Sequence, residues 1–229
     1  MKKNLSRTRQ SDRIRQMVIA GMLSAIVAVL TFTPIGMIPL PPPLPSATTV
    51  HIPVLLAALV EGPVVGLVVG LVFGLCSLIR AWETGMVGLT LFFRDPRISV
   101  LPRILVPLIA FGAWWLWKKC VRSGRVTDKV GASVASVIGT IANTALCLGL
   151  IVVFYGNDLT VMINEMIAAG NAEASYMNNA GAWLVAVVGV PNGIGESIVA
   201  AVIVPMIKTA VEAVLRRTRR AGRRKEENV

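Results

Sequence analysis

"VHIPVLLAALVEGPVVGLVVGLVFGLCSLI", residues 50–79, holds two apolar runs that are separated only by Glu61-Gly62-Pro63. A charge, a helix breaker and a proline suited to a first helical position predict the end of one helix and the start of the next. The second run carries a glycine at every fourth position, namely Gly62, Gly66, Gly70 and Gly74. Glycines at this spacing share one helix face and let another backbone come close. The stretch predicts two packed apolar helices, with a buried re-entrant hairpin as the alternative.

The rest of the chain is equally apolar. Of its 229 residues, 55% are hydrophobic and only 15% are charged, and the mean hydropathy is +0.70, far from the balance of a soluble domain. A spanning helix needs roughly 17 to 25 residues. Apolar runs, two of them short, lie at about 17–34, 50–60, 64–79, 100–117, 130–154 and 182–207. The expected fold class is therefore an all-α membrane protein with six transmembrane helices.

Lysine and arginine are sorted sharply along the sequence. Nineteen of the 23 fall in the N-terminal tail, in the loop 118–129 or in the stretch 208–225. Because positive residues near membrane ends collect in the cytoplasm, both termini are expected there, in a protein of the cytoplasmic membrane. The predicted layout is a basic tail at 1–16, a six-helix transmembrane domain at 17–214 and a basic tail at 215–229. Anchoring beside anionic lipid explains the net charge of +11 better than nucleic-acid binding does.

Motifs for catalysis are missing from the sequence. It contains neither a G-x-x-x-x-G-K-[ST] loop for ATP nor a G-x-S-x-G or H-E-x-x-H motif, and it has a single histidine. Cys76, Cys120 and Cys147 show no paired spacing for a metal or a disulfide, and we interpret them as packing residues. The sequence indicates a binder or carrier rather than an enzyme, with no cofactor and no metal.

Polar side chains within the predicted spans point to function, because they are costly in a bilayer. Four of them are Arg103, Asn143, Asn192 and Glu196. At 1.5 Å per residue, Asn143 lies roughly 20 Å from the cytoplasmic start of its helix and Asn192 roughly 15 Å from the outer start of its own, so the two are nearly level in a core about 30 Å thick. Asn192 and Glu196 share a helix face. One substrate-binding cavity can collect all four; alternatively, the asparagines are interhelical contacts and an arginine neutralises Glu196.

The predicted outer loop between the third and fourth spans adds charged and aromatic residues. Arg97 belongs to an arginine-rich group there, and the arginine fork suits a carboxylate or phosphate. Trp82 lies close enough in sequence to line the same binding site. A solvated charge cluster and an aromatic belt at the membrane interface are the alternative interpretations.

Residues 33–54 hold seven of the thirteen prolines and no charge apart from the histidine. Prolines prevent a helix and stiffen the chain, so this segment is expected to cover a ligand with the apolar side chains of Ile38, Leu40 and Leu44. An inert connector is the alternative. His51, where the segment meets the second helix, either lines the same pocket or packs at the helix start.

The first predicted helix carries small residues at a spacing of four: Ala20, Ser24 and Ala28. Such a face lets another helix approach closely. Spacing alone leaves open whether the face packs inside the protein or docks a partner.

Together these features resemble the substrate-binding S components of energy-coupling factor (ECF) vitamin transporters. The similarity rests on six spans with both ends inside, the small-residue first helix, "PRIL" at 102–105, "NT" at 143–144 and "PNGIGESIVAAVIVP" at 191–205. Within the family, the "HIPV", "EGP" and "PR" elements look most like the pantothenate and folate type branch.

The resemblance implies a small water-soluble vitamin bound near the outer surface, with pantothenate as the best single candidate. It also implies three partner chains, a membrane coupling (T) protein and two cytoplasmic ATPases. The face of Ala20, Ser24 and Ala28 would dock the coupling protein, although Ser24 stands where the family usually has alanine. Three alternatives remain: an S component for another vitamin or precursor, an autonomous ion-coupled carrier with Glu196 as proton or sodium ligand, and a membrane scaffold. The absence of an inverted repeat disfavours the carrier.

Overall fold

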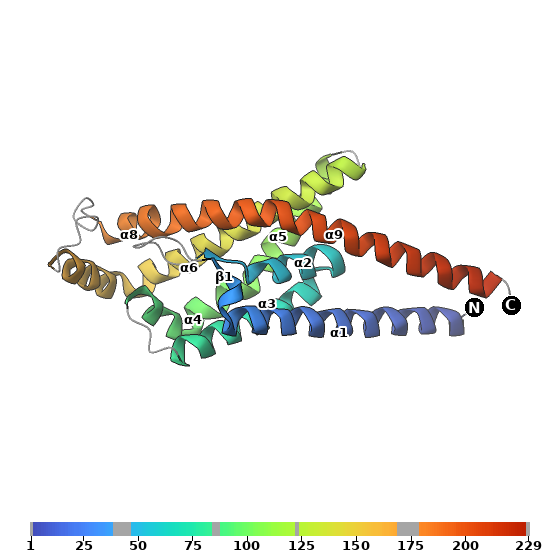
Figure 1. Cartoon of the computed structure of the whole chain (residues 1–229), viewed down its shortest axis with the longest axis horizontal. Helices are drawn as coiled ribbons and strands as arrows, with labels where there is room; N and C mark the ends of the chain where they lie inside the picture. Colours follow the sequence, from blue (N-terminus) through green and yellow to red (C-terminus); the bar gives the residue numbers. More distant parts are fainter. Residues whose placement is uncertain (1, 39–46, 84–87, 122–123, 169–178, 228–229) are drawn as a thin grey trace.

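The computed structural model describes residues 2–38, 47–83, 88–121, 124–168 and 179–227, which form a bundle of helices (Figure 1). Its long helices are α1 (Lys2–Phe32), α3 (Pro63–Glu83), α5 (Leu101–Cys120), α6 (Arg125–Ala168) and α9 (Val190–Glu227). Shorter helical elements are η1 (Pro34–Gly36), α2 (His51–Glu61), η2 (Gly88–Arg94), α4 (Pro96–Ser99), α8 (Ala180–Trp183) and the π-helical turn η3 (Leu184–Gly189). The two-residue strands β1 (Met37–Ile38) and β2 (Ala47–Thr48) pair antiparallel.

Five helical stretches are long and apolar enough to cross a membrane: Arg13–Phe32, Pro63–Glu83, Pro96–Cys120, Val126–Ala168 and Ala180–Val214. The prediction of an all-helical membrane protein is thereby confirmed in its coarse form. The predicted run at about 50–60 forms α2, but the 11 residues of this helix rise only about 16 Å, roughly half the thickness of a hydrocarbon core.

Helix α2 lies inside the bundle. Nine of its residues, from His51 to Leu59, are buried, and it contacts α1, α3, α5, α6 and α9. A helix that is apolar on all sides is typical of such an enclosed position. Gly62 ends α2 with a φ of 101°, a left-handed conformation that side chains disfavour, and α3 begins at Pro63. The helix break predicted at residues 61–63 is confirmed.

The glycine face of α3 packs against α2 and α5. A Cβ atom at Gly66 would lie 2.8 Å from a side-chain carbon of α2. At Gly70 it would lie 2.3 Å from the carbonyl oxygen of Arg103, and at Gly74 2.8 Å from Cα of Val100. Only glycine permits backbones to approach this closely. The spacing therefore predicted an intramolecular contact correctly, and this contact fixes the start of α5, with Arg103, against α3.

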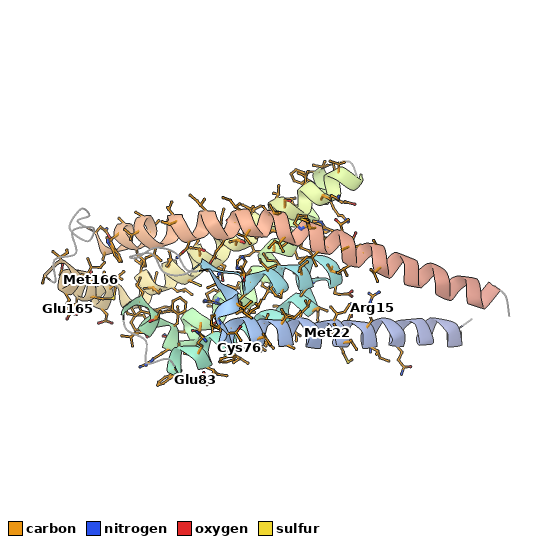
Figure 2. All side chains as sticks on the ribbon, in the orientation of Figure 1. Arg15, Met22, Cys76, Glu83, Glu165 and Met166 are labelled. Atoms are coloured by element: carbon orange, nitrogen blue, oxygen red, sulfur yellow. The ribbon has the colours of Figure 1, made fainter. Side chains whose placement is uncertain are left out.

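The start of α1 and the end of α9 lie at the same end of the molecule (Figure 1). Nη2 of Arg15 on α1 donates a hydrogen bond to Oε2 of Glu61 at 2.9 Å, so the turn between α2 and α3 lies on the same side. Figure 2 shows Glu165, near the end of α6, at the opposite end. Helices α1 and α9 continue through the predicted tail boundaries at residues 16 and 215.

Two irregular points interrupt the helices. Tyr155, with φ −129° and ψ 25°, kinks α6 directly after the predicted run of 130–154, and the chain stays helical to Ala168. The π-helical turn Leu184–Gly189 precedes α9. Turns of this kind widen a helix locally and are frequent beside functional sites.

Candidate functional site

A cavity of about 440 Å³ lies between α3, α5, α6 and α9, within the roughly 300–1,000 Å³ that is typical of small-molecule sites. Thr48 of β2 and three residues of η2 also line it, as do Thr31 of α1, Val50 and Val188. Four residues that the sequence singled out line the cavity together: Arg103, Asn143, Asn192 and Glu196. The fold thus gathers side chains from three helices that are far apart in the sequence.

Arg103 is held firmly in this wall. It is only 7% exposed, and its Nη1 donates hydrogen bonds to the carbonyl oxygen of Ile98 at 2.7 Å and to Sγ of Cys147 at 2.8 Å. Its guanidinium carbon lies 5.4 Å from the ring centre of Phe73 and 5.1 Å from that of Phe93. Cation–π attraction of this kind strengthens when water is excluded. The result is a positioned positive charge beside an otherwise largely apolar cavity.

Helix α6 contributes a polar strip at a spacing of four. Asn143 and Cys147 are both buried, and the Cys147 thiol donates to Oδ1 of Asn143 at 4.0 Å. Because Cys147 also accepts from Arg103, the three side chains form one chain of contacts along the cavity. Thr144, beside Asn143, lines the cavity as well.

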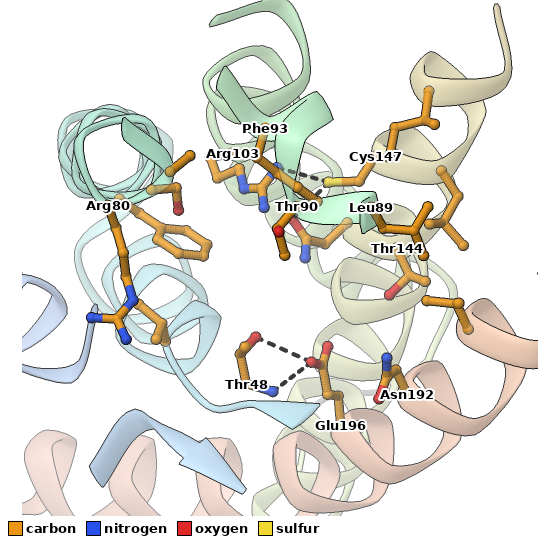
Figure 3. A pocket seen from close by; sticks show the side chains of 18 of the residues that line it. Thr48, Arg80, Leu89, Thr90, Phe93, Arg103, Thr144, Cys147, Asn192 and Glu196 are labelled. Atoms are coloured by element: carbon orange, nitrogen blue, oxygen red, sulfur yellow. Dashed lines mark hydrogen bonds between the residues drawn. The ribbon is translucent and has the colours of Figure 1, made fainter. Parts of the chain in front are cut away.

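Helix α9 supplies the opposite wall (Figure 3). Oε1 of Glu196 accepts hydrogen bonds from the backbone N–H of Thr48 at 2.7 Å and from its hydroxyl at 3.1 Å. One turn earlier, Oδ1 of Asn192 is buried with no hydrogen-bond partner among the described residues. An amide left unsatisfied at a cavity wall is a group that a ligand with hydroxyl or amide functions can pair with.

The cavity is electrostatically divided. Arg103 lies on one wall, and Arg80 of α3 lines the cavity too. Figure 3 shows both arginines across the cavity from Asn192 and Glu196. A ligand with an anionic end and a neutral polar end matches this division.

Three other predicted contacts do not line the cavity. His51 is buried at the start of α2. Trp82 is 64% exposed, and the guanidinium carbon of Arg94 lies 5.3 Å from its ring centre. Arg97 is exposed and stacks over the ring of Phe154 at 5.3 Å. The contacts of Trp82 and Arg97 fit the alternative interpretation, in which these residues form a charge cluster and an aromatic belt at the membrane interface.

The structure describes some of the residues that were predicted to cover the ligand or to dock a partner. Ile38 belongs to β1, whereas Leu40 and Leu44 lie outside the described residues. Ala20 packs partly against the core cluster shared by α1, α2 and α3, and Ser24 and Ala28 are half-buried. A neighbouring small pair, Gly21 and Ala25, is exposed.

Sequence reasoning missed two groups that shape the cavity. Cys147 was interpreted as a packing residue, although its position four residues after Asn143 places both on one helix face. Thr48 carried no signal, because its role depends on a contact with Glu196, 148 residues away in the sequence. Among the described residues, no group of three His, Cys, Asp or Glu side chains is arranged to hold a metal ion.

Comparison with known proteins gives one clear match. The family profile described as "ECF transporter, substrate-specific component" matches residues 15–208. Among individual curated proteins, none matches the chain significantly. The matched range spans the bundle from α1 to the Lys208 turn of α9 and includes every cavity residue named above. The chain therefore belongs to the family of substrate-specific components of ECF transporters.

Proposed function

We propose that this chain captures a small water-soluble vitamin that carries a carboxylate, with pantothenate as the best candidate. One observation carries the proposal: a cavity of ligand size brings the buried guanidinium of Arg103 together with Asn143 and Asn192. An arginine fork pairs well with a carboxylate. The two asparagines suit the hydroxyl and amide groups that pantothenate also carries.

The apolar part of the wall supports the same class of ligand. Val50, Phe73, Leu148, Ile151 and Val188 line the cavity beside the polar groups. Small-molecule sites are typically apolar with a few placed polar groups that fix orientation. A short aliphatic chain between a carboxylate and an amide would fill such a space.

The chain is proposed to cross the cytoplasmic membrane six times with both termini inside. The end of the bundle that holds Arg80 and Arg103 is then the outer one. In this arrangement α2 takes part in one of the six crossings. The start of α1, the α2–α3 turn and the end of α9 share one end of the bundle, and basic residues crowd that end, as the positive-inside rule requires.

Membership of the family supports a set of partners, namely a membrane coupling protein and two cytoplasmic ATPases. We propose that the small-residue surface of α1, formed by Ala20, Ser24 and Ala28 with the exposed neighbours Gly21 and Ala25, docks the coupling protein. We also propose that the proline-rich segment within residues 33–54, with Ile38, Leu40 and Leu44, covers the ligand from the outside. The cavity wall does not include His51, Trp82 or Arg97. Any contribution of these residues to binding would therefore come from outside the wall.

Calorimetric titration of the purified protein with pantothenate and with its alcohol analogue tests the substrate. We expect saturable binding of pantothenate and at least about tenfold weaker binding of the alcohol, which lacks the carboxylate. Equal affinities for pantothenate and the alcohol would contradict the proposal that Arg103 binds the carboxylate of the ligand. If the protein alone in liposomes accumulates pantothenate on a sodium or proton gradient, it is an ion-coupled carrier instead.

A further inference from the structure

The chain directly before α2 is described from Ala47 onward. Its described part is the short ladder in which Thr48 pairs with Met37, followed by Thr49, whose N–H donates to the carbonyl oxygen of Gly36 at 3.0 Å. At membrane depth, non-helical backbone persists only where its polar groups find partners inside the protein. The way in which Thr48 is held therefore decides where this part of the cavity wall lies.

Glu196 supplies that partner from the far side of the cavity. Both donors of Thr48, its N–H and its hydroxyl, reach the same oxygen, Oε1, at 2.7 and 3.1 Å. The Glu196 side chain is only 8% exposed, and β2 contacts α9 directly. Hydrogen bonds to a charged acceptor are roughly twice as strong as neutral ones. This pair ties the strand before α2 to the last long helix.

We propose that Glu196 is a positioning residue, which holds Thr48 in the cavity wall. Oε1 of the carboxylate accepts from both Thr48 donors, so Thr48 is fixed in the cavity wall beside Glu196 and Asn192. Arg103 and Arg80 lie on the facing wall. The site would accept a neutral hydroxyl or amide beside α9.

This inference rests on the proposed function only in taking the cavity as the ligand site. Its test needs no vitamin. Hydrogen exchange followed by mass spectrometry, on the ligand-free protein in lipid nanodiscs, reports the protection of the amides at residues 47–50. We expect Glu196→Ala to speed exchange in this segment at least about tenfold, equivalent to about 1.4 kcal/mol.

Two matched variants separate positioning from other effects. In Glu196→Gln the amide oxygen still accepts both Thr48 bonds, so the exchange rate should stay closer to wild type than in Glu196→Ala. Asn192→Ala removes a polar group from the same helix face without touching Thr48, so exchange at 47–50 should not change. Peptides from α5 and α6 in each variant show whether the bundle remains folded.

Unchanged exchange at residues 47–50 in Glu196→Ala would overturn the inference, and so would equal acceleration by Glu196→Gln and Glu196→Ala. If Glu196→Ala does not fold, comparing Glu196→Gln with Thr48→Val and with the double variant decides the matter. A positioning pair gives a double variant whose loss of thermal stability is smaller than the sum of the single losses, whereas additive losses contradict it. Because no vitamin is added, failure here is distinct from failure to bind pantothenate.

Discussion

Nη1 of Arg103 on α5 donates a hydrogen bond to Sγ of Cys147 on α6 at 2.8 Å. The thiol in turn contacts Asn143 one helical turn away. Two residues that the sequence singled out as polar groups in a membrane are thus joined by a cysteine that it treated as packing. The guanidinium is fixed before any ligand arrives, which lowers the entropy lost on binding.

Arg103 should dominate the affinity for an anionic ligand. Arg103→Ala removes the charge and the fork, and we expect pantothenate binding to weaken about 10- to 150-fold, the range for hydrogen bonds to charged groups. Arg103→Lys keeps a point charge and should lose less. Calorimetric titration measures both. If both variants bind as tightly as wild type while remaining folded, Arg103 has a structural role only.

Cys147 should matter through its contact with Arg103. Cys147→Ser keeps a hydrogen-bond acceptor and should bind pantothenate almost normally. Cys147→Val fills similar space without an acceptor, so binding should weaken about fivefold, or about 1 kcal/mol. The same titration compares the two. Equal affinities of the serine and valine variants would show that the contact does not position the guanidinium.

Gly70 should be sensitive to the smallest enlargement. Its missing Cβ would lie 2.3 Å from the carbonyl oxygen of Arg103, so Gly70→Ala must push α5 away and should cost about 1–3 kcal/mol of stability. Gly149 on α6 has no atom within 4 Å of the same position, so Gly149→Ala serves as the control and should change stability little. Thermal unfolding in detergent measures both. Similar midpoints for the two variants would contradict the close packing of α3 on α5.

The small-residue surface of α1 gives a prediction about coupling. Gly21 and Ala25 are exposed, so Gly21→Trp or Ala25→Trp should block close approach of a partner helix and abolish uptake while leaving pantothenate binding intact. Ala20 packs partly inside, so Ala20→Trp should also lower thermal stability. Uptake assays in cells that express the coupling protein and ATPases provide the test. Normal uptake by both exposed variants would place the docking surface elsewhere.

The ion pair between Arg15 and Glu61 should stabilise the end of the bundle that holds both termini. The Glu61 side chain is 1% exposed and that of Arg15 29%, so the pair is only partly screened by solvent. Glu61→Gln should lower stability by about 1–3 kcal/mol, below the range for fully buried pairs. Glu83→Gln, at the exposed end of α3, is the control and should be neutral. Equal effects in thermal unfolding would count against the pair.

The sequence predicts those features of the fold that depend on local, regularly spaced residues. The apolar runs, the break at Gly62 and the glycine face of α3 are local patterns, and the helices follow them closely. The level depths of Asn143 and Asn192 likewise predicted that both would meet in one cavity. The short helix α2 likewise follows the short apolar run at about 50–60. The kink at Tyr155 depends on how the segments pack, and hydropathy does not encode it.

The remaining site features are contacts between distant segments. Thr48 donates hydrogen bonds to Glu196, and Arg80 of α3 lines the cavity together with residues of α5, α6 and α9. Trp82 and Arg97, which the same charge and aromatic pattern favoured, lie outside that wall. Residue type and depth therefore narrow the candidates, while helix rotation decides which of them face the ligand.

Native mass spectrometry of the protein, purified in mild detergent from cells grown in rich medium, tests the central claim most directly. We expect a one-to-one complex with an anionic water-soluble vitamin, pantothenate first among the candidates, and less of this complex in Arg103→Ala. When the ligand is removed from the wild-type protein, adding the vitamin back should restore the complex. A neutral or cationic compound in the complex, or a folded protein to which no added vitamin binds saturably, would contradict the account.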